Sequence, residues 1–574
     1  AWPAARQVPG RVAVVAGQVL PCCAMPSLWA ATDDARWAMR FRHNARDSIL
    51  LASLAAACSL AAFVFYWRQD ALLLYGDTVA HLNIARRVVD SRTPGLLQLG
   101  SVWLPLPHVL MLPFVLSDWA WRTGVAGSLV SMASYVAGVL AVFRLVRGWA
   151  ARPAAWFAAA IYGANPNLLY MQATAMTEAL YLALVLWATV HFSEFINGLR
   201  DQEPAADSAG KSLERCGMFL AAAMFTRYDA WFASVLFVVV TIGLFVKHRN
   251  PRAGGRALRR SLRSFLLIVA AAPALWMAYN WSVFGGSLEF ATGPYSARAI
   301  AERTSQPGAP HHPGHDSPRV AGIYFLKAAR LNLGDGDWQS VLFLIAIAGV
   351  ALALMLERHA LASMMLWLPV PFYMLSIAYG SVPLFLPAWW PFSYYNVRYG
   401  LQLLPAVAVF SALAMEYVLR MRLPALRRLV AAGAVVLLIG SYASVAYYGP
   451  ICLREARVNS YTRVALERKL AAELARLPVS STLVMHVGSH GGALQRAGIP
   501  LRRVVHEGNF GQWEWALSAP ASAVDYMIAV DGDHVAKAAA AKSSELDIVA
   551  TIESPGQPKA TIYKVRRGKL QITN

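Results

Sequence analysis

Residues 75–108 (YGDTVAHLNIARRVVDSRTPGLLQLGSVWLPLPH) contain side chains of the types that do acid–base chemistry. Asp77 closely follows a hydrophobic segment, and His81 comes four residues later. If the segment is helical, these two side chains share one face of the helix. A carboxylate held at a membrane surface is costly unless it has a partner or a function. The position therefore favours a chemical role for Asp77, and the alternative is that it caps the start of a helix.

Two further charged positions border apolar segments. Glu178 begins an apolar run directly after Thr177, where both residue types suit helix capping and the helix dipole. Arg227 and Asp229 flank Tyr228 in a break between two apolar runs. The simplest interpretation is that this arginine and this aspartate form an ion pair with each other.

Arg398 stands at the start of a later apolar run, within the tyrosine-rich sequence YYNVRYG (394–400). Guanidinium groups bind phosphate through directional hydrogen bonds, so this setting suits a sugar–phosphate headgroup. The alternative is that the tyrosines and the arginine anchor the chain at the membrane interface as part of an aromatic belt.

The composition is that of a membrane protein. Of 574 residues, 57% are hydrophobic and 15% are charged, whereas a soluble protein carries about 25% charged residues. The formal net charge is +20, but the arginines cluster between apolar runs, where membrane orientation and anionic lipid explain them better than nucleic acid. We therefore expect membrane lipids as partners and no nucleic acid. Arg86 and Arg87 are expected to bind anionic headgroups or to extend to the membrane interface.

Repeated apolar runs approaching about 20 residues predict a polytopic helical membrane protein. About eleven spans are predicted, at residues 49–67, 123–146, 154–172, 176–196, 213–226, 229–246, 264–283, 338–356, 361–379, 399–419 and 429–448. The interrupted run 213–246 is interpreted as two crossings, because a single crossing would put the later basic loops on the opposite side of the membrane.

The basic residues predict the orientation. They concentrate in four segments, at residues 40–46, 144–152, 247–263 and 420–428. All four lie on one side of the membrane if every predicted span crosses once, which places the N-terminus in the cytoplasm. The parts that then face outward are the loops 68–122, 284–337 and 380–398 and the chain after residue 449.

Three regions follow from this pattern. Residues 1–48 are expected to be a largely disordered cytoplasmic segment, 49–449 a transmembrane domain and 450–574 a small extracytoplasmic α/β domain. Helical segments alternate in the last region with five β-type runs, at Thr482–Val487, Arg502–His506, Tyr526–Val530, Asp547–Ile552 and Ala560–Val565. This alternation is typical of a partly parallel sheet.

Four stretches, taken in their order along the chain, resemble the GT-C glycosyltransferases. They are YGDTVAHLNIARRV (75–88), NPNLLYMQATAMTEALYLAL (Asn165–Leu184), FTRYDAWF (Phe225–Phe232) and YYNVRYGLQLLPA (Tyr394–Ala406). The resemblance covers residues 49–448 and is to the family 39-like branch, with its protein O-mannosyltransferases, aminoarabinose transferases and Rgt-type glycosyltransferases. It implies an all-α polytopic membrane domain of the GT-C type, here followed by the small α/β domain.

Members of this family move a sugar from a polyprenyl phosphate to an acceptor. The resemblance therefore implies a glycosyltransferase in a bacterial inner membrane, acting on a lipid, glycan or protein at the periplasmic or outer face. The acceptor hydroxyl must lose a proton, and the phosphate must leave with its charge stabilised. Asp77 is the implied general base, with His81 and Glu178 as further catalytic residues. The implied ligands of the donor phosphate are Arg398, Arg227, Lys327, Arg330 and Tyr395.

No cofactor follows with certainty from these residues. Some relatives carry two adjacent acids at the first-loop position, whereas Gly76 precedes Asp77 here and Thr78 follows it. This departure argues against a tightly bound divalent metal. If such a metal is present, the candidate ligands are Asp77, Glu178 and His81.

The rival interpretation is a multi-span lipid or sugar transporter. A transporter predicts two similar halves with interrupted spans at matching positions, and the sequence shows no such repeat. A non-catalytic scaffold is a third interpretation, which would leave Asp77 and Arg398 replaceable.

Overall fold

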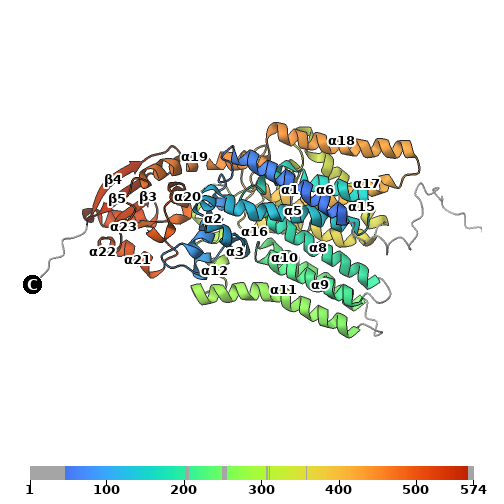
Figure 1. Ribbon diagram of the computed structural model, residues 1–574, viewed down its shortest axis with the longest axis horizontal. Helices are drawn as coiled ribbons and strands as arrows, with labels where there is room; N and C mark the ends of the chain where they lie inside the picture. Colours follow the sequence, from blue (N-terminus) through green and yellow to red (C-terminus); the bar gives the residue numbers. More distant parts are fainter. Residues whose placement is uncertain are drawn as a thin grey trace, which may run out of the picture.

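The computed structural model describes residues 45–200, 206–247, 255–304, 308, 310–356 and 358–566. Most of the predicted N-terminal segment, residues 1–44, lies outside these residues. The described chain forms a long bundle of helices that run mostly along its length, with a small sheet-containing domain at one end (Figure 1).

The bundle contains long helices joined by short loops. Its helices are α1 Ala45–Trp67, α5 Val125–Arg147, α6 Arg152–Gly163, α7 Pro166–Met171, α8 Glu178–Arg200, α9 Ala206–Met224, α10 Asp229–Lys247, α11 Gly255–Phe284, α15 Val341–Leu356, α16 Pro369–Tyr379, α17 Leu404–Leu419 and α18 Pro424–Tyr448. Three 3-10 segments adjoin them: η3 Gly336–Ser340, η4 Arg358–Trp367 and η5 Val397–Leu403.

Nine helical segments among the described residues are long and apolar enough to cross a membrane, so the chain is a multi-pass membrane protein. The predicted spans 154–172 and 213–226 are not among the nine. The first is interrupted because Pro166 disfavours a helical conformation at Asn165, and the Asn165 side chain instead caps the short helix α7. The exact number of crossings, and the orientation that depends on it, remain predictions.

Helix α9, which contains the second of these spans, carries charged residues in its first half, at Lys211, Glu214 and Arg215. It nevertheless belongs to the bundle, where it packs against α8 and α11 (Figure 1). Its apolar face, with Leu213, Cys216 and Leu220, is buried, whereas Lys211 and Arg215 are exposed, as expected for an amphipathic helix.

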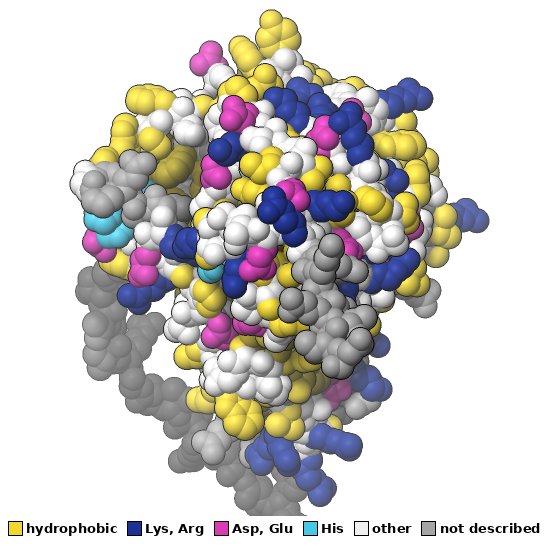
Figure 2. Space-filling view, turned by 90° about the vertical axis from the view of Figure 1, so that its left-hand side faces the viewer, with side chains coloured by type: hydrophobic (Ala, Val, Ile, Leu, Met, Phe, Trp, Pro, Cys, Tyr) yellow, Lys and Arg dark blue, Asp and Glu magenta, His cyan; other side chains and the backbone are white. Residues whose placement is uncertain are grey.

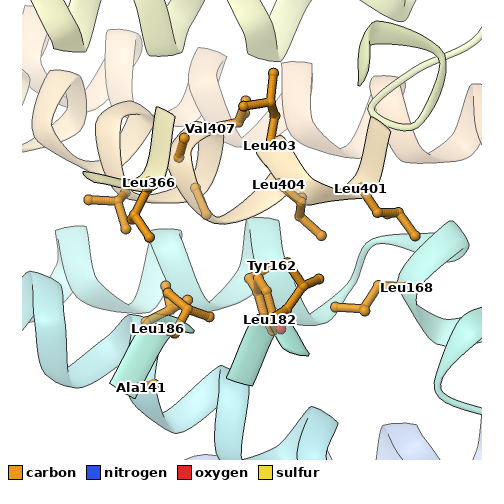
Figure 3. Packing of buried hydrophobic residues seen from close by; sticks show 14 of the residues in the cluster. Ala141, Tyr162, Leu168, Leu182, Leu186, Leu366, Leu401, Leu403, Leu404 and Val407 are labelled. Carbon is orange, nitrogen blue, oxygen red and sulfur yellow. The ribbon is translucent and has the colours of Figure 1, made fainter. Parts of the chain in front are cut away.

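Apolar side chains fill the interior of the bundle. Figure 3 shows Leu182 and Leu186 of α8 facing Leu404 and Val407 of α17, and all four are buried. Where lipid surrounds the helices, such contacts stabilise by close packing more than by removal from water. Elsewhere two helices meet at a glycine: a Cβ atom at Gly349 of α15 would lie 1.8 Å from the carbonyl oxygen of Phe410 in α17.

Shorter helices lie at the end of the bundle that carries the sheet. The first group, which follows α1, is α2 Gly76–Val89, η2 Leu96–Leu99, α3 Leu106–Val115 and α4 Asp118–Thr123. A second group, which follows α11, is α12 Glu289–Thr292, α13 Ala297–Thr304 and α14 Pro318–Leu331. Helices α2, α3 and α12 lie between the bundle and the sheet (Figure 1).

Helix α19 (Ile451–Leu474) connects the bundle to the C-terminal domain. This domain contains the strands β1 Leu483–Met485, β2 Val504–Val505, β3 Tyr526–Val530, β4 Leu546–Ile552 and β5 Ala560–Val565. Its helical segments are α20 Val487–Ala497, η6 Leu501–Arg503, α21 Gly511–Ser518, α22 Pro520–Ala523, α23 His534–Ala541 and η7 Ser543–Glu545. Four of the five predicted strand runs contain an observed strand, and the run Asp547–Ile552 covers all of β4 except its first residue, Leu546.

The sheet has the order β2-β1-β3-β5-β4. Strand β1 pairs in parallel with β2 and β3, whereas β5 pairs antiparallel with β3 and β4. The predicted partly parallel sheet is therefore confirmed. The end of the molecule formed by this domain carries charged side chains of both signs among hydrophobic ones (Figure 2).

The C-terminal domain docks on the end of α2 through buried polar contacts. Asp90 accepts hydrogen bonds from the backbone N–H of Leu501 at 3.1 Å and from the Arg502 side chain at 3.1 Å. Arg86 is buried and pairs with Asp90 at 2.8 Å, and Arg87 lies 4.0 Å from Glu507 of the C-terminal domain. The expectation that Arg86 and Arg87 reach lipid headgroups was therefore wrong, because protein carboxylates hold both of them.

Candidate active site

Asp77 is the second residue of α2, whose N-cap position is occupied by Tyr75. The alternative prediction, that Asp77 caps this helix, was therefore wrong. Its carboxylate instead accepts a hydrogen bond of 2.6 Å from the Nη2 of Arg398. The Asp77 side chain keeps 35% of its surface exposed, so one face of this carboxylate is accessible from outside the protein.

Arg398 is the second residue of η5. The chain enters this segment at Asn396, which adopts a left-handed conformation (φ +57°) that asparagine tolerates better than most residues. The Nε of Arg398 donates to Glu178 at 3.2 Å, and its Nη1 donates to Glu455 at 3.4 Å. The guanidinium group also lies over the ring of Tyr75, 5.0 Å from the centroid. Arg398 thus brings together carboxylates from three separate parts of the chain.

Glu178 is fully buried at the first residue of α8. One of its oxygens accepts from Arg398 at 3.2 Å and from Arg227 at 3.5 Å. Its other oxygen has no hydrogen-bond partner in the described part of the chain. The Glu178 carboxylate therefore binds two guanidinium groups, which goes beyond the simple helix-capping role considered for it.

The predicted ion pair between Arg227 and Asp229 is confirmed. The Nε of Arg227 donates to both Asp229 oxygens at 3.0 Å. The hydroxyl of Tyr373 donates to Asp229 at 3.0 Å and accepts from Arg227 at 3.2 Å. Because Arg227 also contacts Glu178, this pair is continuous with the cluster around Arg398.

Glu455 belongs to the same cluster but was not among the predicted site residues. It lies on α19, where its side chain is almost completely buried. It accepts hydrogen bonds from the backbone N–H of Arg398 at 3.2 Å and from the hydroxyl of Tyr75 at 3.2 Å. The only available signal was its position, a few residues after the last apolar run, which parallels the position of Asp77 after the first.

Carboxylates outnumber guanidinium groups in this cluster. The charged members are Arg398, Arg227, Asp77, Glu178, Asp229 and Glu455. Buried charges are stable only when they are paired, and here each guanidinium group has at least two carboxylate neighbours. A phosphate that approached Arg398 would therefore have to compete with a carboxylate already bound to it.

A cavity of about 240 Å³ adjoins the cluster. The side chains that line it include His81, Trp103, Arg227, Tyr228, Tyr373 and Tyr399. The Nδ1 of His81 lies 2.8 Å from the Nε2 of His108, so each imidazole fixes the orientation of the other. Burial lowers the pKa of His81 to about 4, although the nearby Asp77 raises it. His81 is therefore neutral at pH 7 and faces the cavity as a hydrogen-bonding group.

Comparison with known proteins identifies the fold. No protein-family model matches the chain, and no curated protein matches it. Its structure is similar to ArnT from Cupriavidus metallidurans bound to undecaprenyl phosphate, with a TM-score of 0.57 and 12% identity over 90% of this chain and 97% of ArnT. ArnT in the apo state gives a TM-score of 0.50 and 14% identity over 88% of this chain and 97% of that one.

The chain has the GT-C fold. The fold implied by the sequence resemblance is thus confirmed. The likeness also extends beyond residues 49–448, which are 400 of the 574 residues, because it covers 90% of the chain. The Archaeoglobus fulgidus oligosaccharyltransferase tethered with an acceptor peptide also matches, with a TM-score of 0.46 and 12% identity over 86% of this chain and 70% of that one.

The other predicted ligands of the donor phosphate lie at different distances from the cluster around Arg398. Tyr395 lies near the cluster. Burial raises the pKa of its hydroxyl, and the nearby carboxylate of Asp77 raises it further. Lys327 and Arg330 lie apart on α14, where they donate to Gln339 and Ser340. The structure therefore brings Asp77, Glu178, Arg227 and Arg398 together but gives Lys327 and Arg330 a separate environment.

The predicted alternative metal ligands do not fit a metal site. The guanidinium group of Arg398 bonds to Asp77 and to Glu178, where a cation shared by these carboxylates would otherwise sit. His81 is bonded through Nδ1 to His108. Among the described residues, no group of three or more His, Cys, Asp or Glu side chains is arranged to hold a metal ion.

Proposed function

We propose that this protein is a membrane glycosyltransferase that moves a sugar from a polyprenyl-phosphate donor to a lipid, glycan or protein acceptor. The observation that carries this proposal is the pair of Asp77 and Arg398 beside a cavity, within a fold similar to that of a protein crystallised with undecaprenyl phosphate. The volume of about 240 Å³ is below the range of about 300–1,000 Å³ for drug-sized ligands. It suits one sugar unit better than an oligosaccharide.

Asp77 is the carboxylate best placed to act as the general base. Glu178 and Glu455 are almost completely buried and Asp229 is 7% exposed, whereas Asp77 is 35% exposed. An incoming acceptor hydroxyl can reach only a carboxylate that is accessible. Proton transfer to such a base contributes roughly 10²–10⁴-fold to the rate of a reaction of this kind.

Arg398 is the proposed ligand of the leaving phosphate. Its Nη2 contacts the accessible carboxylate of the cluster, that of Asp77, whereas its other donors contact buried acids. A donor phosphate can therefore replace Asp77 at Nη2 without disturbing Glu178 or Glu455. This exchange would also leave the Asp77 carboxylate free to accept the proton of an incoming acceptor hydroxyl.

The remaining residues have supporting roles in this mechanism. Glu178 holds the guanidinium groups of Arg398 and Arg227 in place through a shared oxygen. Arg227 lines the cavity and is a second candidate cation for the phosphate. His81 is proposed to accept or donate a hydrogen bond to a sugar or acceptor hydroxyl in the cavity. Tyr395 is a further candidate ligand of the donor headgroup.

Lys327 and Arg330 remain weaker candidates for the donor phosphate, since they do not contact the cluster around Arg398. Nucleotide sugars are cytoplasmic, so a polyprenyl-linked donor accords with the predicted location of this site on the periplasmic or outer face of a bacterial inner membrane. In that orientation the N-terminus is cytoplasmic and the C-terminal domain is extracytoplasmic.

The test uses the full-length protein in lipid nanodiscs with a set of radiolabelled polyprenyl-phosphate sugars and separate lipid, glycan and peptide acceptors. Asp77→Asn should reduce sugar transfer by roughly 10²–10⁴-fold. The same variant should bind polyprenyl phosphate at least as tightly as the wild type, because a competing carboxylate has been neutralised. Asp531→Asn, at an exposed acid of the C-terminal domain, is the control and should change neither measurement.

Other outcomes separate the alternatives. Normal transfer by Asp77→Asn would remove this residue as the base. Parallel loss of donor binding and transfer would contradict the proposed exchange at Arg398. Movement of labelled lipid between leaflets, without release of polyprenyl phosphate with any acceptor, would support the transporter interpretation instead.

A further inference from the structure

A second polar site lies on the outside of the molecule, away from the cavity beside Arg398. It is a shallow basin of about 610 Å³ between α4, α19 and α20. The residues that line it are Asp118, Trp119, Arg122, Thr123, Arg468, Ala471 and Arg496. Arg122, Arg468 and Arg496 thus come from three different helices, of which α19 and α20 lie where the C-terminal domain adjoins the bundle (Figure 1).

The positive charge of this basin is poorly matched by carboxylates of the described residues. Arg122 donates to the backbone carbonyl of Arg496, at 2.9 Å. Arg122 and Arg468 have no carboxylate within ion-pair distance in the described part of the chain. The one acid in the lining, Asp118, is already paired with Arg86. An anion from outside the protein would therefore meet two guanidinium groups that no carboxylate of the described chain neutralises.

Arg496 is the most constrained of the three arginines. Its side chain is 24% exposed, and its Nε lies 3.6 Å from Glu467, too far for a hydrogen bond. The other Glu467 oxygen pairs with Arg463 at 2.7 Å. Burial lowers the pKa of Arg496 and the nearby Glu467 raises it, whereas the neighbouring charges of Arg468 and Arg463 lower it further. This mutual repulsion is relieved by an anion bound among the guanidinium groups.

Apolar residues border one side of the basin. Trp119, in the lining itself, is 56% exposed, and its ring packs edge-on against that of Trp67, at 6.3 Å between centroids. Trp67 is the last residue of the apolar helix α1 and is 42% exposed, and Leu116 is 65% exposed. Tryptophans at the end of a membrane span mark the level of the lipid headgroups. We therefore expect these arginines to lie near the level of the headgroup phosphates.

We propose that this basin binds the phosphate of an anionic phospholipid from the leaflet on the side of the C-terminal domain. The guanidinium groups of Arg122, Arg468 and Arg496 hold the phosphate, and Trp119 contacts the glycerol and the start of the acyl chains. The arrangement ties the C-terminal domain to the membrane surface through α19 and α20. The proposal does not depend on the proposed sugar transfer.

The experiment measures binding of short-chain phosphatidylglycerol, phosphatidylcholine and inorganic phosphate to the full-length protein in detergent micelles. The double variant Arg122→Gln/Arg468→Gln should bind phosphatidylglycerol roughly tenfold more weakly, with binding of phosphatidylcholine little changed. Trp119→Ala should weaken phosphatidylglycerol binding but not phosphate binding. The control is Arg476→Gln, exposed just beyond the end of α19 and outside the basin lining, which should bind like the wild type.

Three results would overturn the proposal. The first is equal affinity of the wild type for phosphatidylglycerol and phosphatidylcholine. The second is equal loss in the double variant and in Arg476→Gln. The third is inorganic phosphate binding as tightly as the lipid, with the same dependence on the arginines and none on Trp119, which would identify a site for free anions. A thermal unfolding scan of each variant shows that the fold is retained, which is expected because Arg122 and Arg468 are exposed.

Discussion

The guanidinium group of Arg398 lies 2.6 Å from a carboxylate oxygen of Asp77, across 321 positions of sequence. Asp77 belongs to α2 on the sheet-bearing end of the molecule, and Arg398 belongs to η5 at the start of the apolar segment that continues into α17. Asp77 is partly exposed, whereas Glu178 and Glu455 are buried on the other sides of the same guanidinium group. Among these three carboxylates, Asp77 is therefore the one that a substrate can replace.

Arg398→Lys should impair use of the donor more than use of the acceptor. Lysine keeps the charge but loses the planar fork that contacts Asp77, Glu178 and Glu455 simultaneously. We expect the KM for the polyprenyl-phosphate donor to rise roughly tenfold, with the KM for the acceptor changed much less. Steady-state kinetics with each substrate varied in turn provides the measurement.

The matched control is Arg144→Lys, which alters another arginine–glutamate pair of the bundle, with Glu194 at 2.6 Å. That pair lies at the other end of α5 from the α2 region and should leave both KM values unchanged. Equal increases in both KM values for Arg398→Lys would indicate a general disturbance of the fold and would count against a phosphate-binding role.

Gly400→Ala should damage the site by displacing η5. A Cβ atom at this position would lie 2.5 Å from the backbone of Ala328 in α14, so one of the two segments has to move. Overpacking of this kind costs about 1–3 kcal/mol, and Arg398 lies only two residues away. We expect a lower unfolding temperature together with reduced sugar transfer. Gly433→Ala is the control, because among the described residues no atom beyond the adjacent backbone of its own helix lies within 4 Å of the place its Cβ would take, and alanine favours the helix α18.

His108→Phe should reduce the transfer rate without weakening donor binding. His108 bonds to the Nδ1 of His81 at 2.8 Å and thereby fixes the imidazole that lines the cavity. Without this bond His81 can rotate, and we expect kcat to fall roughly tenfold or more. His108→Gln should restore part of the rate, because its amide can either donate or accept. Failure of glutamine to do better than phenylalanine would contradict this positioning role.

Much of the fold was predictable because it depends on local composition. Apolar runs of membrane-spanning length identified nine spans that the structure confirms as candidates, and β-branched runs identified all five strands. The two predicted spans that are not among these nine candidates depend on particular residues more than on overall composition. Pro166 interrupts the predicted span 154–172, and α9 is amphipathic, with its apolar face buried against neighbouring helices and Lys211 and Arg215 exposed.

The members of the cluster around Arg398 were predictable where a charge bordered an apolar run, as for Asp77, Glu178 and Arg398 itself. Glu455 was missed because it belongs to the polar helix α19, where its position after the last apolar run is a weak signal among several charged residues, and the fold brings it to Arg398. Arg87 was misinterpreted for the same reason. Its partner Glu507 is supplied by the C-terminal domain, so a residue that looks like an interfacial arginine is a docking contact instead.

The docking of the C-terminal domain should weaken in acid. Burial lowers the pKa of His506 from 6.5 to about 3, with a smaller contribution in the same direction from Arg87. In the folded protein the Nδ1 of His506 accepts a hydrogen bond from the backbone N–H of Gly508 at 3.1 Å, which requires an unprotonated nitrogen. In the unfolded chain His506 takes up a proton below pH 6.5. The contribution of neutral His506 to the free energy of unfolding is therefore fully present above pH 6.5 and is lost progressively as the pH falls toward 3.

Because of this titration of His506, the free energy of unfolding should be about 2 kcal/mol lower at pH 5 than at neutral pH. Thermal unfolding of the detergent-solubilised protein between pH 7.5 and 5 measures it. His506→Asn retains an acceptor for Gly508 but does not titrate in this range, so its unfolding temperature should fall less steeply. His534→Asn, at a histidine on α23 outside this interface, should follow the wild type. The same acid dependence in His506→Asn as in the wild type would assign the effect to other groups of the interface.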